Sequence, residues 1–287
     1  MPPLFKKMAV CGVGLIGGSL AMIARDKGLV ESVSGIGRTQ ANLDIALRRG
    51  IIDSATRDPA EGARGADLIV LAVPILTMRA ALERLIPSCG PNAVITDVGS
   101  VKGYVVRELE PLITEKRSLV AAHPVAGKET TGAAAADPDL FKDRRTIITP
   151  SKTSTPEAIA KITELWRATG ARVEEMDPQT HDQLLARASH LPQIIASVLA
   201  AALEGEKVGP RLAAEYGATG LRDTTRLAAS SWEMWRDIMV ANRDAISAAL
   251  KLYGETFDQF RQAAESGDVA TLEEMFNRGR AMREHLK

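Results

Sequence analysis

A short glycine-rich segment near the start of the chain has the residue spacing of a phosphate-binding turn. Gly12, Gly14 and Gly17 form the pattern G-x-G-x-x-G between an apolar run and a helical pattern. In such a pattern the first glycine allows a tight turn, the second lets backbone approach a pyrophosphate, and the third lets the helix pack against the strand. Leu15 and Ile16 lie within the turn, and the N–H groups where the helix begins attract a negative phosphate. The segment predicts a dinucleotide site; the alternative is an ordinary glycine-rich turn.

The residues after the second predicted strand bear on which dinucleotide is bound. A site that prefers NAD usually has Asp or Glu there, to bind the ribose 2′-hydroxyl. This chain has Arg38 and Thr39 instead, and a guanidinium can pair with a 2′-phosphate. The residues therefore favour NADP over NAD, although NAD is acceptable if Arg38 only stacks on the adenine. Val73 and Pro74 follow another strand and are expected beside the ribose or the nicotinamide, unless the proline only terminates that strand.

Four further segments carry polar and charged side chains where a predicted strand or helix ends. Residues 96–103 have the sequence T-D-V-G-S-V-K-G, and residues 122–132 have the sequence A-H-P-V-A-G-K-E-T-T-G. Both are expected at the same edge of the sheet, because the carboxyl ends of parallel strands line the ligand crevice. In the second half, S-H-L-P at 189–192 interrupts one helical pattern and G-L-R-D-T-T-R at 220–226 opens another. These segments offer side chains suited to proton transfer and to binding of carboxylates.

The first half of the chain must position these residues, and its pattern is that of a parallel sheet covered by helices. Continuous apolar runs at 68–73 and 93–98 suit strands that are buried on both faces. A helix is predicted from Pro156 to Ala168, with Thr155 as its cap. The other predicted strands are 8–13, 32–37, 119–122, 146–149 and an edge strand at 172–176, and the other predicted helices are 17–27 and 40–50. The fold class is therefore α/β, with a doubly wound, Rossmann-type parallel sheet.

Strand-like patterns disappear after residue 178. Helices are predicted at about 179–205, 222–229, 232–260 and 269–285, with breaks inside them. We therefore predict a dinucleotide-binding domain at 1–178 and an all-helical domain at 179–287. The segment 191–203 is apolar on nearly every side. It forms either the centre of the second domain or a helix shared by two subunits, and the small size of this domain favours a homodimer.

The composition limits the classes of partner. Lys plus Arg and Asp plus Glu are equal at 36 each, so no net charge attracts nucleic acid or an acidic membrane. The two cysteines form neither a metal-ligand spacing nor a disulfide framework, and no metal is expected. The chain begins without a signal-peptide pattern and contains no run of about 18 apolar residues. We expect a cytoplasmic protein with no membrane segment.

Taken in order, the motifs resemble those of the prephenate and arogenate dehydrogenases. The resemblance runs from about residue 9 to about residue 242 and includes D-x-G-S-x-K, H-P-x-A-G, S-H-L-P and R-D-x-T-R. It implies a dinucleotide-binding domain followed by a helical dimerisation domain, in agreement with the organisation above. It also implies a reaction of tyrosine biosynthesis, within aromatic amino acid biosynthesis. A cyclohexadiene with a ring hydroxyl and two carboxylates gives a hydride to the nicotinamide and loses carbon dioxide, and its ring becomes aromatic.

The resemblance assigns roles to two residues at the predicted crevice. His123 is the catalytic histidine, which accepts the proton of the substrate hydroxyl, and a neutral imidazole near pH 7 suits that role. The alternative is a histidine that only packs against Pro124. Ser100 orients this histidine or the substrate hydroxyl; it is also a favoured residue for a helix cap.

Three residues of the helical half are matched to substrate binding. His190 helps to hold the substrate, unless it is a core or interface residue. Arg222 binds a substrate carboxylate through its forked guanidinium, unless it forms an ion pair with Asp223. Arg226 is a weaker candidate for the substrate and is otherwise assigned to the dimer interface. Lys102 lies in a motif, but we expect it on the surface or at a helix start.

Lys128 departs from the family, which commonly has Ser or Thr after the glycine of H-P-x-A-G. A lysine there adds a positive charge near the substrate side chain, which is expected to disfavour the ammonium group of arogenate relative to the keto acid of prephenate. Two other functions fit the same domain plan. A β-hydroxyacid dehydrogenase has a catalytic lysine in its helical domain, where this chain has S-H-L-P and an Arg-Asp pair. A non-catalytic sensor that binds NADP needs no histidine at position 123.

Overall fold

The computed structural model describes residues 2–114 and 116–286, and the chain divides into two compact units. The first unit comprises Met1–Leu185 and Ala229–Asn242, and the second comprises Ala186–Ala228 and Arg243–Lys287. Residues 229–242 thus return to the unit that holds the sheet, although they follow the helical segments in the sequence.

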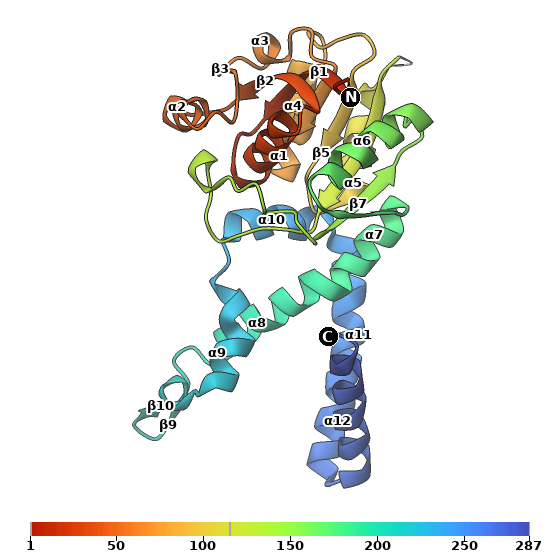
Figure 1. Cartoon of the computed structure of the whole chain (residues 1–287). Coiled ribbons are helices and arrows are strands. Elements are labelled where there is room, and N and C mark those ends of the chain that lie inside the picture. The colour runs from red at the N-terminus through yellow and green to blue at the C-terminus, as the bar shows by residue number, and fades with distance from the viewer. Residues whose placement is uncertain (1, 115, 287) are drawn as a thin grey trace. The chain divides into compact units, whose positions relative to one another are not determined.

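The first unit is built on a sheet of eight strands in the order β3-β2-β1-β4-β5-β6-β7-β8 (Figure 1). Neighbouring strands are parallel, except that β7 runs antiparallel to β6. This confirms the predicted doubly wound sheet, to which the sequence analysis did not assign the short edge strand β3. The strands are β1 (Phe5–Cys11), β2 (Val30–Ile36), β3 (Ser54–Thr56), β4 (Leu68–Leu71), β5 (Val94–Asp97), β6 (Ser118–Pro124), β7 (Arg145–Pro150) and β8 (Arg172–Glu175).

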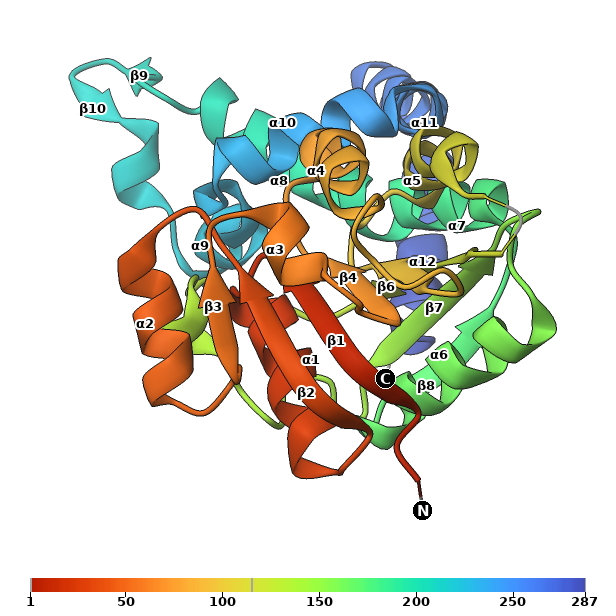
Figure 2. The same ribbon diagram turned by 90° about the horizontal axis from the view of Figure 1, so that it is seen from above.

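Helices cover both faces of this sheet (Figure 2). Helices α1 and α6 pack together on one face, and α3, α4, α5 and α7 follow one another across the other. The helices of this unit are α1 (Leu15–Asp26), α2 (Gln40–Arg48), α3 (Pro59–Ala63), α4 (Met78–Leu85), α5 (Lys102–Leu109), α6 (Pro156–Ala168), α7 (Pro178–Leu185) and α10 (Trp232–Ala241), with short turns η1 (Ile75–Thr77), η2 (Glu110–Leu112) and η3 (Ala133–Ala135). Because the strands β1, β2, β4, β5 and β6 are parallel, the loops after them meet at one edge of the sheet.

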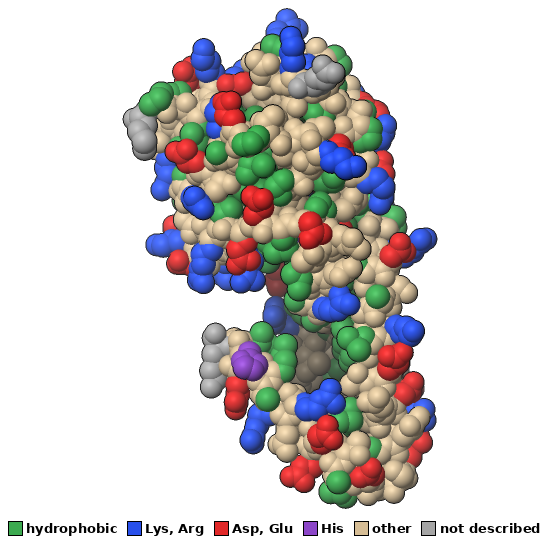
Figure 3. Space-filling model, turned by 90° about the vertical axis from the view of Figure 1, so that its right-hand side faces the viewer, with side chains coloured by type: hydrophobic (Ala, Val, Ile, Leu, Met, Phe, Trp, Pro, Cys, Tyr) green, Lys and Arg blue, Asp and Glu red, His purple; other side chains and the backbone are tan. Residues whose placement is uncertain are grey.

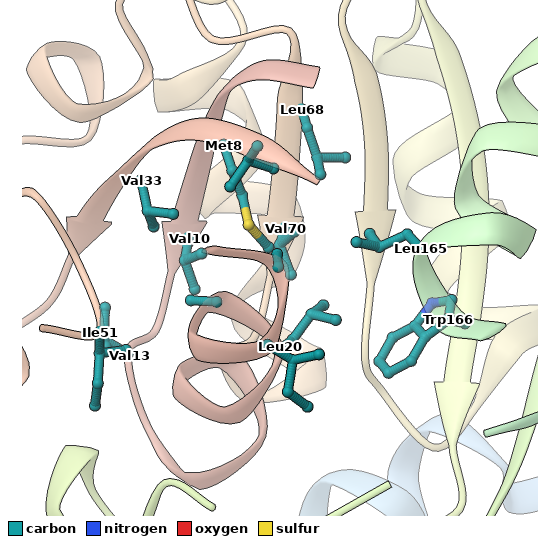
Figure 4. Close-up of a cluster of buried hydrophobic side chains, with 14 of the residues drawn as sticks. Met8, Val10, Val13, Leu20, Val33, Ile51, Leu68, Val70, Leu165 and Trp166 are labelled. Carbon is teal, nitrogen blue, oxygen red and sulfur yellow. The ribbon is translucent and has the colours of Figure 1, made fainter. Parts of the chain in front are cut away.

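The core lies between the sheet and the helices α1 and α6. Figure 4 shows Val10 of β1, Val70 of β4 and Leu20 of α1 in one layer, with Trp166 of α6 beside them. Leu20 and Trp166 are fully buried, and Phe141 meets Trp166 edge to face with ring centroids 5.2 Å apart. Burial of each such side chain stabilises the fold by roughly 1.5–3 kcal/mol. The apolar periodicity of the sequence therefore determines how the sheet packs against α1 and α6, and this packing holds the loops at the edge of the sheet in place.

Helix α6 begins and ends as its residue types predict. The Thr155 hydroxyl accepts a hydrogen bond from the Ala158 N–H at 3.2 Å, and Pro156 occupies the first helical position, where its missing N–H is not needed. After the helix, Gly170 adopts a φ of +83°, which favours glycine. The predicted cap, first residue and end of this helix are confirmed.

The second unit is helical with one small hairpin. Its elements are η4 (Ala186–His190), α8 (Leu191–Ala202), β9 (Lys207–Val208), β10 (Arg211–Leu212), η5 (Ala213–Tyr216), α9 (Thr219–Thr225), η6 (Arg226–Ala229), α11 (Arg243–Ser266) and α12 (Val269–Glu284). The turn η4 is π-helical and directly precedes the Leu191-Pro192 step. Pro192 has no N–H for the regular helical bond, so the helical pattern is interrupted there, as the sequence predicts. The hairpin β9–β10 was not expected from the sequence.

The helices of the second unit expose large apolar side chains. Val198 of α8 is 61% exposed, and Phe257 of α11 and Phe276 of α12 are 55% and 71% exposed. By length and composition alone, residues 178–202 form a helix that could cross a membrane, which differs from the expectation of no such segment. An apolar helix that is only partly covered within one chain also fits a subunit interface.

Candidate active site

Two glycines of the turn after β1 are required by packing. Gly12 has a φ of +101°, and a Cβ there would lie 2.2 Å from the Ala72 carbonyl oxygen at the end of β4. At Gly17 a Cβ would lie 2.3 Å from the Gly12 carbonyl oxygen and 2.7 Å from the Ala72 Cβ. The turn, the start of α1 and the end of β4 are therefore packed backbone against backbone, which only glycine permits.

Gly14 differs from these two glycines, because a Cβ there would meet no atom within 4 Å. It is the N-cap of α1, whose first residues are Leu15 and Ile16. No side chain caps this helix, and its first turn has no acidic residue. The first N–H groups of a helix have no partner within the helix, and without a capping side chain or an acidic residue this helix start suits the pyrophosphate of a dinucleotide. The fold does not need a glycine at this position, but a closely bound phosphate would.

The other proposed cofactor residues lie at the ends of β2 and β4. Arg38 and Thr39 are exposed, and within residues 2–114 and 116–286 neither side chain has a hydrogen-bond or ion-pair partner. Val73 is half-buried, with its Cγ1 3.2 Å from the place a Gly12 Cβ would take. Pro74 is exposed and precedes η1. A guanidinium and a hydroxyl are therefore available at the point where the sugar of a dinucleotide is bound in this fold.

Lys102 is completely buried, although one of the two predicted places for it was the surface. It does occupy the first position of α5, the other predicted place. Its ammonium forms an ion pair with Asp97 at the end of β5 and donates to the Ala122 carbonyl oxygen of β6 at 2.7 Å. The Asp97 carboxylate also accepts hydrogen bonds from the N–H groups of Gly99 at 2.7 Å and Ala122 at 3.2 Å. Lysine tolerates full burial only when its charge is paired, and Asp97 supplies that pairing.

The same cluster contains two histidines in direct contact. Nδ1 of His123, on β6, lies 2.8 Å from Nε2 of His181, on α7. Nδ1 of His181 lies 2.8 Å from Oδ1 of Asp182. His123 is 8% exposed and His181 is fully buried. Three side chains therefore form a chain of contacts from the interior of the cluster to the end of β6.

Asp182 joins this chain to the start of α5. Its two carboxylate oxygens accept hydrogen bonds from the N–H groups of Lys102 at 2.7 Å and Gly103 at 2.8 Å. The N-cap residue of α5 is Val101, and Ser100, which is half-buried, does not cap the helix. The acid that caps α5 thus comes from another helix, 80 residues further along the chain.

Burial and neighbouring charges shift the pKa of two basic side chains in this cluster, Lys102 and His181. Burial lowers the pKa of Lys102, and the carboxylates of Asp97 and Asp182 oppose that shift. Burial also lowers the pKa of His181, and the hydrogen bond to Asp182 opposes it, while the nearby Lys102 charge adds to it. His181 is therefore a neutral imidazole at pH 7.

Lys128 lies on the loop after β6 and is half exposed. Its ammonium forms an ion pair with Asp137, and that hydrogen bond lowers the pKa of the Asp137 carboxyl. The positive charge that we predicted beside a substrate side chain is thus partly balanced within the same loop.

His190, Arg222 and Arg226 belong to the second unit. His190 is 1% exposed and ends the π-helical turn η4. Arg222 in α9 and Arg226 in η6 are exposed. Across the described chain neither arginine forms an ion pair, so the alternative pairing of Arg222 with Asp223 is not found. Both guanidinium groups are available to an anion.

Two residues of the buried cluster, His181 and Asp182, escaped the sequence analysis. They stand as an adjacent His-Asp pair shortly after Asp177-Pro178, and that pair is the one signal the sequence offered. Among the residues that the structure describes, no group of three or more His, Cys, Asp or Glu side chains is placed to hold a metal ion. The face in Figure 3 carries Lys and Arg side chains intermingled with Asp and Glu, without a field of one sign.

Comparison with known proteins gives the same family for both halves of the chain. Residues 20–175 match the family model for "prephenate dehydrogenase, nucleotide-binding domain", and residues 177–278 match that for "prephenate dehydrogenase, dimerization domain". The cyclohexadienyl dehydrogenase of Zymomonas mobilis is 34% identical over 285 residues, which cover 99% of this chain and 97% of that protein. Prephenate dehydrogenase from A. aeolicus, solved with hydroxyphenyl propionate and NAD+, has a TM-score of 0.91 at 27% identity and covers 98% of both chains. The arogenate dehydrogenase of Synechocystis has a TM-score of 0.87 at 30% identity, covering 98% of this chain and 100% of that one.

Proposed function

Since the chain belongs to the prephenate dehydrogenase family, we propose that it oxidises and decarboxylates prephenate or arogenate with His123 as the proton acceptor. The chain is an NAD(P)-dependent oxidoreductase of this type, and its product is 4-hydroxyphenylpyruvate from prephenate or tyrosine from arogenate. The observation that carries the role of His123 is its position at the end of β6, in a cluster that fixes its ring.

The reaction needs alignment and one proton acceptor. When bound, the nicotinamide supplies the hydride acceptor for the hydroxyl-bearing carbon. His123 takes the hydroxyl proton as the C–O bond becomes a carbonyl. The bond to the ring carboxylate then breaks, its electron pair passes through the ring to that oxygen, and the proton returns from His123. Because the ring becomes aromatic, His123 need not be a strong base, and Ser100 is proposed to orient it or the substrate hydroxyl.

Substrate binding is proposed for the residues that match the family's motifs. Arg222, whose guanidinium is exposed and unpaired in the described chain, binds a substrate carboxylate. His190 helps to hold the substrate, and Arg226 assists in binding it or serves the dimer interface.

Lys128 is proposed to influence the choice between the keto acid of prephenate and the amino acid of arogenate. Comparing kcat/KM for both substrates in the wild type and in Lys128→Ser tests this role. A ratio of the two kcat/KM values that is the same in both proteins removes Lys128 from the account.

For the cofactor we propose a preference for NADP. The support is Arg38, exposed and unpaired in the described chain, in place of the carboxylate that binds the ribose of NAD. Gly12, Gly14, Leu15, Ile16, Gly17, Thr39, Val73 and Pro74 are proposed to complete the site. Arg38→Ala is expected to raise the KM for NADP by about tenfold, the value of one lost charge-assisted contact of about 1.4 kcal/mol, and to leave that for NAD nearly unchanged. A wild type that strongly prefers NAD contradicts this assignment.

The protein is a dimer that acts on a small molecule. We propose that residues 1–178 bind the dinucleotide, that residues 179–287 serve substrate binding and dimerisation, and that a second subunit covers the exposed apolar side chains of α8, α11 and α12. On this view residues 178–202 are an interface helix rather than a membrane segment, and the protein works in the cytoplasm without nucleic acid or membrane partners. Light scattering of the purified protein without detergent tests this; a need for detergent contradicts it.

A spectrophotometric assay with prephenate and arogenate, each with NAD and NADP, tests the whole proposal. His123→Asn is expected to lower kcat by about 10²–10⁴-fold while the dissociation constant of the dinucleotide stays within twofold. Turnover of neither substrate by a folded dimer would contradict the proposed reaction. Full activity of His123→Asn would contradict the proposed role of the imidazole alone.

A further inference from the structure

We infer that His181, held by Asp182, determines which ring nitrogen of His123 accepts the substrate proton, so that His181 is a positioning residue for the reaction. The inference rests on the proposed function of His123 and adds two residues to it. It is supported by a continuous series of hydrogen-bond contacts that runs from the start of α5 through Asp182 and His181 to His123.

The direction of the hydrogen bonds follows from the far end of this series. The Asp182 carboxylate accepts hydrogen bonds from the backbone N–H groups of Lys102 and Gly103, which can only donate. Its carboxylate is therefore the acceptor on every side, including toward His181. Nδ1 of His181, 2.8 Å from Oδ1, must then carry a proton and donate it.

The protonation of His181 fixes that of His123. Burial lowers the pKa of His181, so its ring is neutral and holds one proton, the one on Nδ1. Its Nε2 then has a lone pair and accepts from Nδ1–H of His123 at 2.8 Å. A neutral His123 with its proton on Nδ1 has its lone pair on Nε2. The geometry thus makes Nε2 the basic nitrogen of His123.

The same arrangement supports the ring after it has accepted a proton. A protonated His123 keeps its Nδ1–H bond to His181, and the Asp182 carboxylate stands behind that bond. Lys102 and Asp97, the other charges of the cluster, neutralise each other. The ring therefore needs no rotation between its neutral and its charged form, which keeps the base aligned.

The tautomer of His123 can be observed directly, because the chain has four histidines. In the dimer labelled with ¹⁵N-histidine, long-range ¹H–¹⁵N correlation spectra distinguish a protonated Nδ1 from a protonated Nε2, and His123→Asn identifies the signals of residue 123. We expect His123 to be protonated on Nδ1 in the wild type, without substrate. His123 protonated on Nε2 would overturn the inference whether or not any variant folds.

Two variants at position 181 test the consequence for catalysis. In His181→Gln the side-chain oxygen still accepts from His123, so the Nδ1–H form and most of the activity are expected to remain, within about tenfold of the wild type. His181→Leu removes the acceptor; the Nε2–H form of His123 should then appear, and kcat should fall by ~100-fold or more while KM and dinucleotide affinity change little. His285→Gln, at the exposed end of α12, is the matched control and should change neither kcat nor the tautomer of His123.

Equal kcat values for the Gln and Leu variants would overturn the inference, because a merely structural role does not depend on an acceptor. If neither substrate were turned over but the wild-type spectra showed Nδ1–H, the proposed function would fail and the hydrogen-bond series would stand. If turnover were found together with Nε2–H, the function would stand and the role of His181 would fail.

Discussion

Replacing Lys102 by methionine removes one charge from a fully buried ion pair and keeps most of the side-chain length. In the wild type the ammonium meets the Asp97 carboxylate and donates to the Ala122 carbonyl oxygen at 2.7 Å. In Lys102→Met, Asp97 keeps only the N–H groups of Gly99 and Ala122 as partners. A buried carboxylate then remains without an opposite charge.

The expected cost follows from these contacts. Breaking a buried ion pair from one side lowers the free energy of unfolding by about 3–5 kcal/mol. The two backbone donors that Asp97 retains place the expected loss near the lower end of that range, at ~3 kcal/mol. Urea unfolding at neutral pH, followed by tryptophan fluorescence, measures it. Subunit concentration must be held equal, because the stability of a dimer depends on it.

Two further variants separate charge from volume. Lys128→Met breaks the half-exposed pair with Asp137 and should cost at most about 1 kcal/mol. The double variant Lys102→Met/Asp97→Leu removes both charges of this buried ion pair, and most of the lost stability should return. If Lys102→Met lowers the free energy of unfolding no more than Lys128→Met does, Lys102 and Asp97 are not a strongly coupled buried ion pair.

Three other predictions rest on single contacts. Thr155→Ala should lower the free energy of unfolding by about 1 kcal/mol, since the Ala158 N–H loses its acceptor; an unchanged urea midpoint contradicts it. Burial lowers the pKa of His181 below its usual 6.5, so below that pH the unfolded chain binds more protons than the folded chain. The free energy of unfolding should therefore fall as the pH drops through 6.5. Urea titrations at a series of pH values measure this slope, and His181→Gln should flatten it. Gly17→Ala should destabilise the fold by about 1–3 kcal/mol, because its Cβ would collide with backbone. Gly14→Ala should leave the melting temperature unchanged and weaken dinucleotide binding by ~10-fold, as measured by calorimetry. Equal effects of the two variants on stability would contradict the difference in packing.

Most of the fold could be predicted because local patterns and tertiary packing agree. The apolar run at 68–73 contains β4, which is buried on both faces, and Thr155-Pro156 marks the start of α6 without any knowledge of its neighbours. Antiparallel β7 and the short strand β3 depend on pairing that leaves no periodic signal in three to six residues. The two-residue strands β9 and β10 are too short for any periodicity to develop.

The buried cluster could be predicted only in part, for a physical reason that differs between its members. His123 and Asp97 stand in motifs that follow strands, so their shared edge of the sheet could be inferred. The place of Lys102 at a helix start was predicted, but its burial was not, because lysine is almost never fully buried unless paired, and its pairing with Asp97 depends on how the loop between them closes. His181 and Asp182 reach the cluster from a helix about 60 residues beyond His123, and no spacing rule connects them.

The cluster explains why these residues must come together rather than act alone. Asp182 holds the first N–H groups of α5 and the Nδ1–H of His181 with the same carboxylate. Lys102, at that helix start, neutralises Asp97 and donates to the strand that carries His123. The groups that stabilise the helix start therefore also fix the ring that takes the proton. In Asp182→Asn an amide oxygen at the Oδ1 position can still accept from Nδ1–H of His181 and from the Lys102 N–H, whereas the Gly103 N–H then faces an NH2 group and loses its acceptor. We therefore expect the ¹H–¹⁵N spectra of this variant to show His123 still protonated on Nδ1 while urea unfolding shows a lower stability. A His123 protonated on Nε2 would contradict this reading of the hydrogen bonds.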